Sequence, residues 1–140
     1  MAFASKVNVN LPENAKLRGL PTIQGIVVVS DAKNGRPLAV MDSIALTGIR
    51  TAATAALAAQ YGARKNSTRA AIIGCGAQAK YQLEAMRSVF ALRTIRVYDI
   101  DKARAEAYAA THSMQDCTVT PAPRGGHLHH LHDVEVTRPD

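Results

Sequence analysis

Two glycines and one acidic residue have the spacing of a dinucleotide-binding site. Gly74 and Gly76 begin a Gly-x-Gly-x-x-Ala motif that ends at Ala79 and directly follows the apolar run 70–73. In such a motif the first glycine permits a tight turn, the second lets the backbone approach a pyrophosphate, and the small third residue lets a helix pack closely on a sheet. Asp99 follows 25 residues after Gly74, near the spacing of about 20 expected for a carboxylate that binds a ribose.

The residues between these positions fit the same interpretation. Ala77 and Gln78 complete the turn, and a helix is expected over 78–91. Its N-terminus would offer free N–H groups and a partial positive charge to phosphates. The alternative is a glycine-rich turn between a strand and a helix with no ligand. The apolar strand, the helix and the Asp at the end of the next strand together favour the dinucleotide.

Alternating strands and helices are expected to position this motif. Beyond the strand at 70–73, we expect strands over 95–98 and near 118–120, and a helix over 102–111. Strands that alternate with helices form a parallel sheet. The order βαβαβ is one half of a doubly wound sheet, so the fold class is α/β.

The first third of the chain has a different pattern. Residues 5–21 are rich in Asn and Pro and are expected to be irregular. The β-branched run 23–30 predicts a strand, Asn34-Gly35 a hairpin turn, and residues 37–41 the return strand.

A long helix is expected after this hairpin. Asp42 and Ser43 are candidate N-caps for a helix over 44–61, and Gly62 would end it. The helix is so rich in Ala that we expect it to pack closely against another element.

Composition excludes several classes of function. The chain has 140 residues, 47% of them hydrophobic and 4% aromatic, which is enough for about one domain with an aliphatic core. The formal charge is +6, but the basic residues are spread out and lack an aromatic stacking platform, so no nucleic-acid partner is expected. This positive charge either forms a solvated basic surface or attracts an anionic ligand.

The cysteines and the apolar segments indicate where such a chain would be found. Cys75 and Cys117 make no disulfide framework, and Cys75 is expected to be a small buried filler in the glycine turn. No segment resembles a secretory signal or a membrane span, so we expect a cytoplasmic protein with no membrane partner.

The C-terminal residues 121–140 do not continue the alternation and are expected to be an irregular tail. Four histidines lie close together there, at His127, His129, His130 and His132. They could hold a metal, but the segment lacks Cys or carboxylate ligands at zinc-finger spacing. No metal site is therefore predicted.

Beyond the glycine turn, the chain resembles the ornithine cyclodeaminase/μ-crystallin family over about residues 6–110. Five short segments carry the resemblance, in the right order: Lys6-Val7-Asn8 with Pro12-Glu13-Asn14, Gly19-Leu20-Pro21-Thr22, Gly35-Arg36-Pro37-Leu38-Ala39, Leu46-Thr47-Gly48-Ile49-Arg50-Thr51-Ala52-Ala53, and Ile73-Gly74-Cys75-Gly76-Ala77-Gln78.

The resemblance implies a homodimeric NAD(P)-dependent enzyme built from two domains. Residues 1–62 would be part of an α+β substrate and dimerisation domain, and residues 68–120 the first half of an NAD-binding Rossmann domain. Family activities include conversion of L-ornithine to L-proline with release of ammonia, alanine dehydrogenation and reduction of cyclic imines. In each, hydride passes between nicotinamide and the α-carbon of an amino acid.

On the substrate side, the resemblance gives roles to Lys6 and Arg50. Lys6 resembles the family's active-site lysine near the substrate carboxylate and is the expected catalytic residue. Arg50 resembles the arginine that grips this carboxylate and lies near the cofactor. An arginine fork can hold a carboxylate by two parallel hydrogen bonds, and a lysine can donate a proton or act as a base. Without the resemblance, Lys6 would usually be a solvated charge, and Arg50 is either a snorkelling surface residue or a charge placed in the helix for function.

On the cofactor side, Thr22 resembles a cofactor-contacting threonine, Ala77 and Gln78 match the pyrophosphate turn, and Asp99 matches the acid that binds the ribose. An acid there favours NAD over NADP, because it would repel a 2′-phosphate. The alternative for Asp99 is a cap for the helix that begins near residue 101.

The resemblance also indicates which parts of the family's pattern are absent from these 140 residues. The family's second nucleotide-binding half and its catalytic Asp have no counterpart among the 140 residues, so we expect an inactive fragment of an ornithine cyclodeaminase-like enzyme. The alternatives are an alanine dehydrogenase or ketimine reductase of the same family, a non-catalytic μ-crystallin-like binding protein, and an inert fragment.

Overall fold

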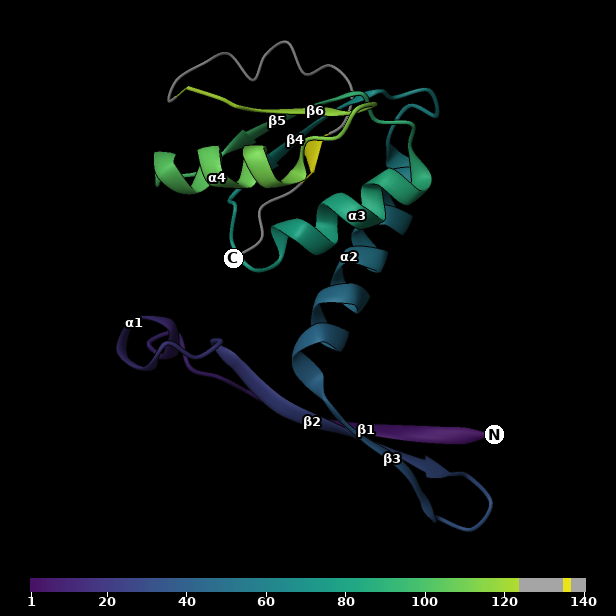
Figure 1. Ribbon diagram of the computed structural model, residues 1–140. Helices are drawn as coiled ribbons and strands as arrows, with labels where there is room; N and C mark the ends of the chain where they lie inside the picture. Colours follow the sequence, from purple (N-terminus) through teal and green to yellow (C-terminus); the bar gives the residue numbers. More distant parts are fainter. Residues whose placement is uncertain (124–134, 137–140) are drawn as a thin grey trace. The chain divides into compact units, whose positions relative to one another are not determined.

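The computed structural model describes residues 1–123 and the short strand at 135–136. Its contacts divide the chain into two compact units, Met1–Gly48 and Ile49–Asp140, and Figure 1 labels the elements of both. Among the described residues, no helix is both long and apolar enough to cross a bilayer.

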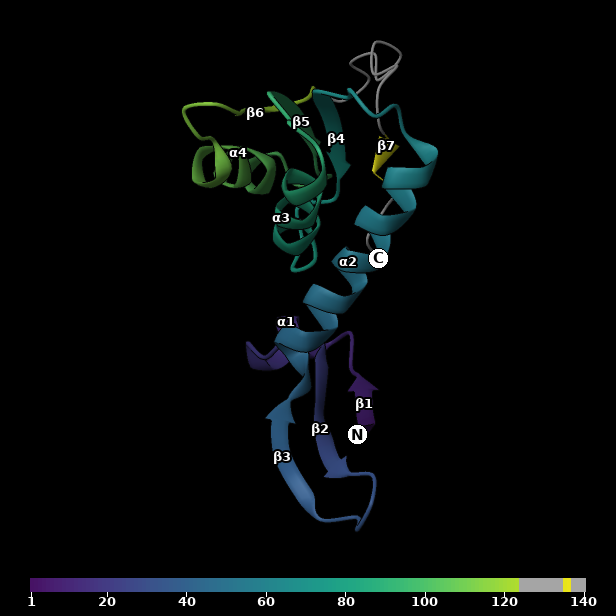
Figure 2. The same ribbon diagram turned by 90° about the vertical axis from the view of Figure 1, so that its right-hand side faces the viewer.

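Unit 1 contains an antiparallel three-stranded sheet in the order β1-β2-β3 (Figure 2), formed by Ala2–Asn10, Ile23–Asp31 and Pro37–Asp42. The predicted hairpin of the second and third strands is confirmed, and Gly35 adopts the positive φ of 73° that its turn requires. The Asp31 carboxylate accepts the N–H groups of Lys33 and Asn34 at 2.7 and 3.4 Å and stabilises this turn.

The prediction that residues 5–21 are irregular is wrong. Strand β1 pairs with β2 along its whole length, from Ala2 opposite Asp31 to Asn10 opposite Ile23. Residues 6–10 alternate polar and apolar side chains, which is a strand pattern. Asn is uncommon in strands, so the Asn content of this segment favours a loop although its alternation favours a strand. A short helix, α1 (Asn14–Arg18), follows and ends at Gly19 with a φ of 64°.

The predicted Ala-rich helix is confirmed as α2, Ser43–Gly62. The Asp42 carboxylate accepts the Ile44 N–H at 2.7 Å, which is the hydrogen bond of a helix N-cap. In unit 1, Ser43 and Thr47 are buried one helical turn apart, and Val27 of β2 is buried as well. Sheet and helix thus share a small core, while Phe3, Val7 and Val40 of the sheet remain exposed.

Unit 2 has the predicted alternation of strands and helices. Its elements are β4 (Arg69–Ile73), α3 (Ala79–Val89), β5 (Thr94–Tyr98), α4 (Lys102–His112) and β6 (Thr118–Pro121). The strands are parallel in the order β6-β5-β4-β7, where β7 is the two-residue strand Glu135–Val136, which the sequence did not predict. The α/β class with a parallel Rossmann-like sheet is therefore confirmed.

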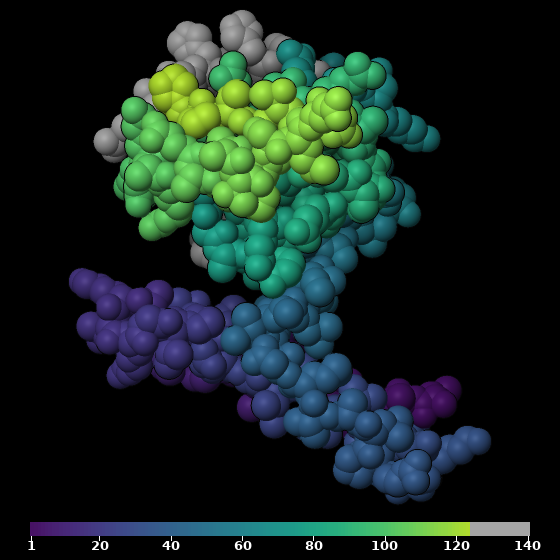
Figure 3. Space-filling view, in the orientation of Figure 1, coloured from purple at the N-terminus to yellow at the C-terminus, as the bar shows by residue number. Residues whose placement is uncertain are grey.

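The core of unit 2 is aliphatic, as the low aromatic content predicts. Its members include Ala56 of α2, Leu83 of α3, and Ile95 and Val97 of β5. The space-filling view shows α4 and β6 side by side on one face of unit 2 (Figure 3). The buried Tyr108 hydroxyl of α4 donates to the carbonyl of Ala79 at 2.9 Å and fastens α4 to the start of α3.

We predict that Gly25→Ala destabilises the sheet of unit 1. A Cβ at this position would lie 2.2 Å from the Val7 carbonyl oxygen and 2.5 Å from Oδ1 of Asn8, so strand β1 would have to move. We expect a loss of about 3 kcal/mol in the free energy of unfolding, measured with urea, and faster amide exchange in β1 and β2. Gly62→Ala is the matched control, because a Cβ there meets no atom within 4 Å. Equal stability of the two variants would contradict the prediction.

Candidate functional site

The glycine turn begins where strand β4 ends. Gly74 has a φ of 98°, which a residue with a side chain rarely adopts, and its N–H donates to the Tyr98 carbonyl at 2.7 Å. The turn after β4 is thereby tied to the end of β5. Gly74 is needed by the fold itself, with or without a ligand.

Gly76 differs from Gly74 in what surrounds it. It is exposed, and a Cβ built on it would meet no protein atom within 4 Å. The protein's own packing therefore does not require glycine here. The open space next to its backbone is where a ligand could approach closely.

Helix α3 starts directly after this open space. Its N-cap residue, Gln78, makes no side-chain capping hydrogen bond, and the Ala79 N–H donates to the Gly76 carbonyl at 3.1 Å. Gln78 Oε1 is buried and has no hydrogen-bond partner among the described residues. An uncapped helix N-terminus beside an orphaned buried polar atom suits an anionic, hydrogen-bonding ligand such as a pyrophosphate bound to a ribose.

Asp99 lies at the end of β5 with its side chain only 5% exposed. Its Oδ2 accepts the Cys75 N–H at 2.7 Å, and its Oδ1 accepts the Asp101 N–H at 2.9 Å. The Arg104 guanidinium lies 3.5 Å from Oδ1. Burial by itself raises the pKa of Asp99, but the two backbone N–H groups and Arg104 outweigh it and hold the pKa below its usual value.

The N-cap of α4 is Asp101 rather than Asp99. The Asp101 carboxylate accepts the Arg104 N–H at 3.3 Å, and its side chain is 50% exposed. The sequence analysis did not single out Asp101 or Arg104. An Asp side chain that accepts the N–H of the third residue after it is a common helix N-cap. This pattern could have identified Asp101 from the sequence.

Cys75 is buried inside the glycine turn, as the sequence predicts. Burial, and then the neighbouring Asp99 carboxylate, raise the pKa of its thiol to about 11, although Arg104 opposes this. The thiol is therefore protonated at neutral pH and is a poor nucleophile.

The other predicted site residues lie on both units. In unit 1, Lys6 Nζ donates to Thr47 Oγ1 at 2.7 Å, and Thr22 lies just before β2, where its carbonyl accepts the Leu11 N–H at 2.7 Å. In unit 2, Arg50 is exposed on α2. The structure thus brings together Gly74, Gly76, Ala77, Gln78 and Asp99. That Lys6, Thr22 and Arg50 join them in one site stays a prediction.

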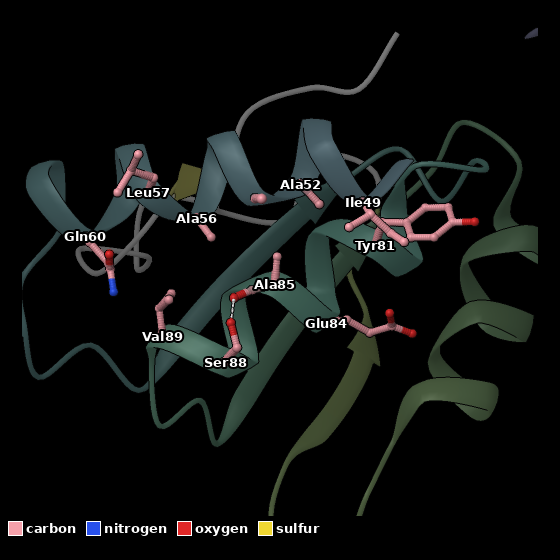
Figure 4. A pocket seen from close by; sticks show the side chains of 11 residues that line it. Ile49, Ala52, Ala56, Leu57, Gln60, Tyr81, Glu84, Ala85, Ser88 and Val89 are labelled. Carbon is pink, nitrogen blue, oxygen red and sulfur yellow. Dashed lines mark hydrogen bonds between the residues drawn. The ribbon is translucent and has the colours of Figure 1, made fainter. Parts of the chain in front are cut away.

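An apolar groove of about 490 Å³ lies between α2 and α3 in unit 2 (Figure 4). Figure 4 shows small and apolar side chains of the two helices, such as Ala52, Ala56 and Val89, facing this groove. The lining residues include none of the predicted site residues. The groove is therefore a feature separate from the glycine turn.

No cluster of three or more His, Cys, Asp or Glu side chains within the described residues could hold a metal ion. The four histidines of the C-terminal segment lie outside the described residues.

The sequence matches the model of the ornithine cyclodeaminase/mu-crystallin family over residues 2–126. It is 39% identical to an alanine dehydrogenase of Archaeoglobus fulgidus over 79% of this chain and 34% of that protein. It is 46% identical to an ornithine cyclodeaminase of Agrobacterium tumefaciens over 64% of this chain and 25% of that protein. The Thermococcus litoralis Δ1-pyrroline-2-carboxylate reductase, solved with NADH and L-proline, superimposes with a TM-score of 0.80 and 38% identity, over 86% of this chain and 38% of that one.

These matches cover most of this chain but only part of each relative. The chain spans about a third or less of the length of the two curated relatives. The family match over residues 2–126 includes the glycine turn and residues of both units.

We predict that Asp99→Asn loosens the glycine turn. An amide has one acceptor oxygen and an NH2 group, so either the Cys75 or the Asp101 N–H would face another donor. We expect a loss of about 1–3 kcal/mol in the free energy of unfolding near pH 7.

The pH dependence of this loss provides a second test. Because the pKa of Asp99 is lower in the folded chain than in the unfolded one, its carboxylate stabilises the fold fully above the unfolded value of about 3.9. This contribution disappears as the pH falls through the folded pKa, so the difference between wild type and Asp99→Asn should shrink below about pH 4. Urea titrations from pH 3 to 7 measure it, with exposed Asp116→Asn as the control. A difference that stays constant down to pH 3 would exclude the carboxylate as its source.

Proposed function

Because this chain belongs to the ornithine cyclodeaminase/mu-crystallin family, we propose that it binds a nicotinamide dinucleotide at the glycine turn. The observation that carries the proposal is the open space at Gly76, beside a helix N-terminus without a side-chain cap. The fold does not require glycine at position 76, whereas a ligand that approaches the backbone there would require it. The reductase from Thermococcus litoralis, solved with NADH, supports the same choice of cofactor.

Each residue of the turn has a task in this proposal. The backbone at Gly76 and Ala77 would face the pyrophosphate, and the N-terminus of α3 would stabilise its negative charge. Gln78 would place its amide beside the phosphates or the adjoining ribose. Asp99 would hold the turn in shape and present its carboxylate toward the ribose hydroxyls. When bound, the nicotinamide would supply the hydride transfer of the reaction.

We propose NAD rather than NADP as this cofactor. Two carboxylates, those of Asp99 and Asp101, stand together at the end of β5. Arg104 interacts with both, at 3.5 and 3.7 Å, so its charge is already partly compensated. A 2′-phosphate would meet more negative than positive charge there.

The substrate is proposed to be an amino acid or its cyclic imine, since the relatives include an ornithine cyclodeaminase, an alanine dehydrogenase and a pyrroline-2-carboxylate reductase. Lys6 would donate hydrogen bonds to the substrate carboxylate and exchange a proton near the α-carbon, and Arg50 would grip the carboxylate. Thr22 would contact the cofactor. Among these activities we favour conversion of L-ornithine to L-proline with ammonia release.

Assembly into a homodimer is part of the same proposal. The exposed apolar side chains of the unit 1 sheet, such as Phe3, Val7 and Val40, support a second copy of this chain as its partner. Sedimentation velocity would detect the dimer, and Val7→Lys would weaken it.

We predict that Gly76→Ala weakens NAD binding at least tenfold without changing stability. The added methyl group meets no protein atom, so folding is unaffected, but it would occupy the space that a pyrophosphate needs. Calorimetric titration of the full chain with NAD and with NADP measures both affinity and preference. Gly62→Ala, at the end of α2, controls for a glycine removed elsewhere. Equal binding by wild type and Gly76→Ala would contradict the proposed cofactor site.

Enzyme assays separate the candidate activities. Release of ammonia and proline from L-ornithine would support cyclodeaminase activity, and NADH production with L-alanine would support dehydrogenase activity. NADH consumption with a cyclic imine would support a reductase. NAD binding without any turnover would indicate a binding protein instead.

A further inference from the structure

The lysine assigned to the substrate in the proposed function is held by a neighbour with no assigned role. Lys6 Nζ and Asn8 Nδ2 both point at the Thr47 hydroxyl oxygen, at 2.7 and 3.5 Å. The same hydroxyl lies 2.5 Å from the Ser43 carbonyl oxygen. Thr47 is itself buried, with 8% of its surface exposed.

The chemistry of these groups fixes the direction of each hydrogen bond. A carbonyl oxygen can only accept, so the single hydroxyl proton of Thr47 goes to Ser43. The two lone pairs of Thr47 Oγ1 are then left for donors. An ammonium group and an amide NH2, which have no acceptor atoms at those nitrogens, meet this requirement.

The unit 1 sheet brings these donors to the helix. Lys6 and Asn8 are two residues apart on β1, so they project from the same face. Lys6 is opposite Val27 of β2, which is buried. Asn8 is opposite Gly25, where any Cβ would approach Asn8 Oδ1 to 2.5 Å. The glycine thus provides the room in which the Asn8 side chain turns toward Thr47.

The partner of Lys6 is a neutral hydroxyl rather than a carboxylate. Within the described residues, Lys6 forms no ion pair, so its positive charge is not compensated. Thr47 takes one of the three ammonium N–H groups, and two remain for a ligand. A lysine held in this way has lost much of its side-chain freedom but none of its charge.

We propose that Thr47 is a positioning residue that holds the Lys6 ammonium ready for the carboxylate of an amino-acid substrate. Asn8 supports it by donating to the Thr47 hydroxyl, and Gly25 by leaving room for Asn8 in the β1–β2 pairing. This inference rests on the proposed function for the identity of the ligand, but the hydrogen-bonded arrangement is a property of the chain alone.

Ammonium resonances of the ¹⁵N-labelled full chain test the arrangement without any substrate. In wild type, the Lys6 ammonium protons should exchange with water about three- to tenfold more slowly than those of Lys16 and Lys33. All three lysines are exposed, so the bond to Thr47 is what distinguishes Lys6. Lys6→Arg assigns the signal by its loss. Thr47→Val should abolish the slow exchange, and Thr47→Ser, which keeps the hydroxyl, should restore it.

Thr111→Val is the matched control. Thr111 makes the same hydroxyl-to-carbonyl bond within a helix, to Ala107 at 2.8 Å, but is far from Lys6 along the chain and lies in unit 2. It should leave the Lys6 signal unchanged. Amide spectra of each variant establish that it is folded.

Two outcomes overturn the inference. One is a wild-type Lys6 signal that exchanges as fast as Lys16 and Lys33, which needs no variant and so does not depend on whether Thr47→Val folds. The other is a folded Thr47→Val variant that keeps the slow exchange.

A titration separates this inference from the proposed function. If the slow exchange depends on Thr47 but the Lys6 signal does not move on titration with L-ornithine and NAD, the positioning stands and the proposed substrate fails. Should the chain turn over substrate, Thr47→Val is expected to raise KM more than it lowers kcat.

Discussion

The candidate site depends on one buried carboxylate that joins two parts of a parallel sheet. The glycine turn and the end of β5 are separated by a whole helix in sequence, because neighbouring parallel strands are linked only by crossovers. Asp99 links the two by accepting the Cys75 N–H of the glycine turn and the Asp101 N–H of the residues after β5. The Gly74 N–H donates a second hydrogen bond between them, to the Tyr98 carbonyl. A carboxylate buried without these donors would be costly, so the turn and the acid stabilise each other.

The two glycines of the turn differ in the way that the motif predicts for them. Gly74 has a backbone conformation that only glycine adopts easily, so it would be required in a turn without any ligand. Gly76 faces open space and has no such constraint. Gly76 is therefore the more informative residue about binding, because the fold alone does not explain it.

The sequence predicts the elements that local patterns determine. The order of strands and helices in unit 2 follows from apolar runs and turn residues, as do the Asn34-Gly35 hairpin and the helix after Asp42. Strand β1 is harder to predict, because its Asn residues favour a loop and the pairing with β2 that stabilises the strand is not local in sequence. The bond from the Cys75 N–H to Asp99 and the bond from Lys6 to Thr47 could not be predicted, because sheet pairing and helix packing bring these residues together across 24 and 41 positions.

Asp99 of unit 2 and Lys6 of unit 1 are charged residues whose hydrogen-bond partners differ, with opposite consequences. Asp99 is nearly enclosed, and two backbone N–H groups and Arg104 use most of the acceptor capacity of its carboxylate. Most of its acceptor capacity holds the turn in shape, and the remainder is what the proposed function offers to a ribose hydroxyl. Lys6 is bound by a single hydroxyl and keeps two donors and its full charge. In the proposed function, Asp99 acts mainly through the shape that it gives the turn, whereas Lys6 acts through direct contact with an anion. A substitution that preserves shape but removes charge should therefore affect folding at Asp99 and ligand binding at Lys6.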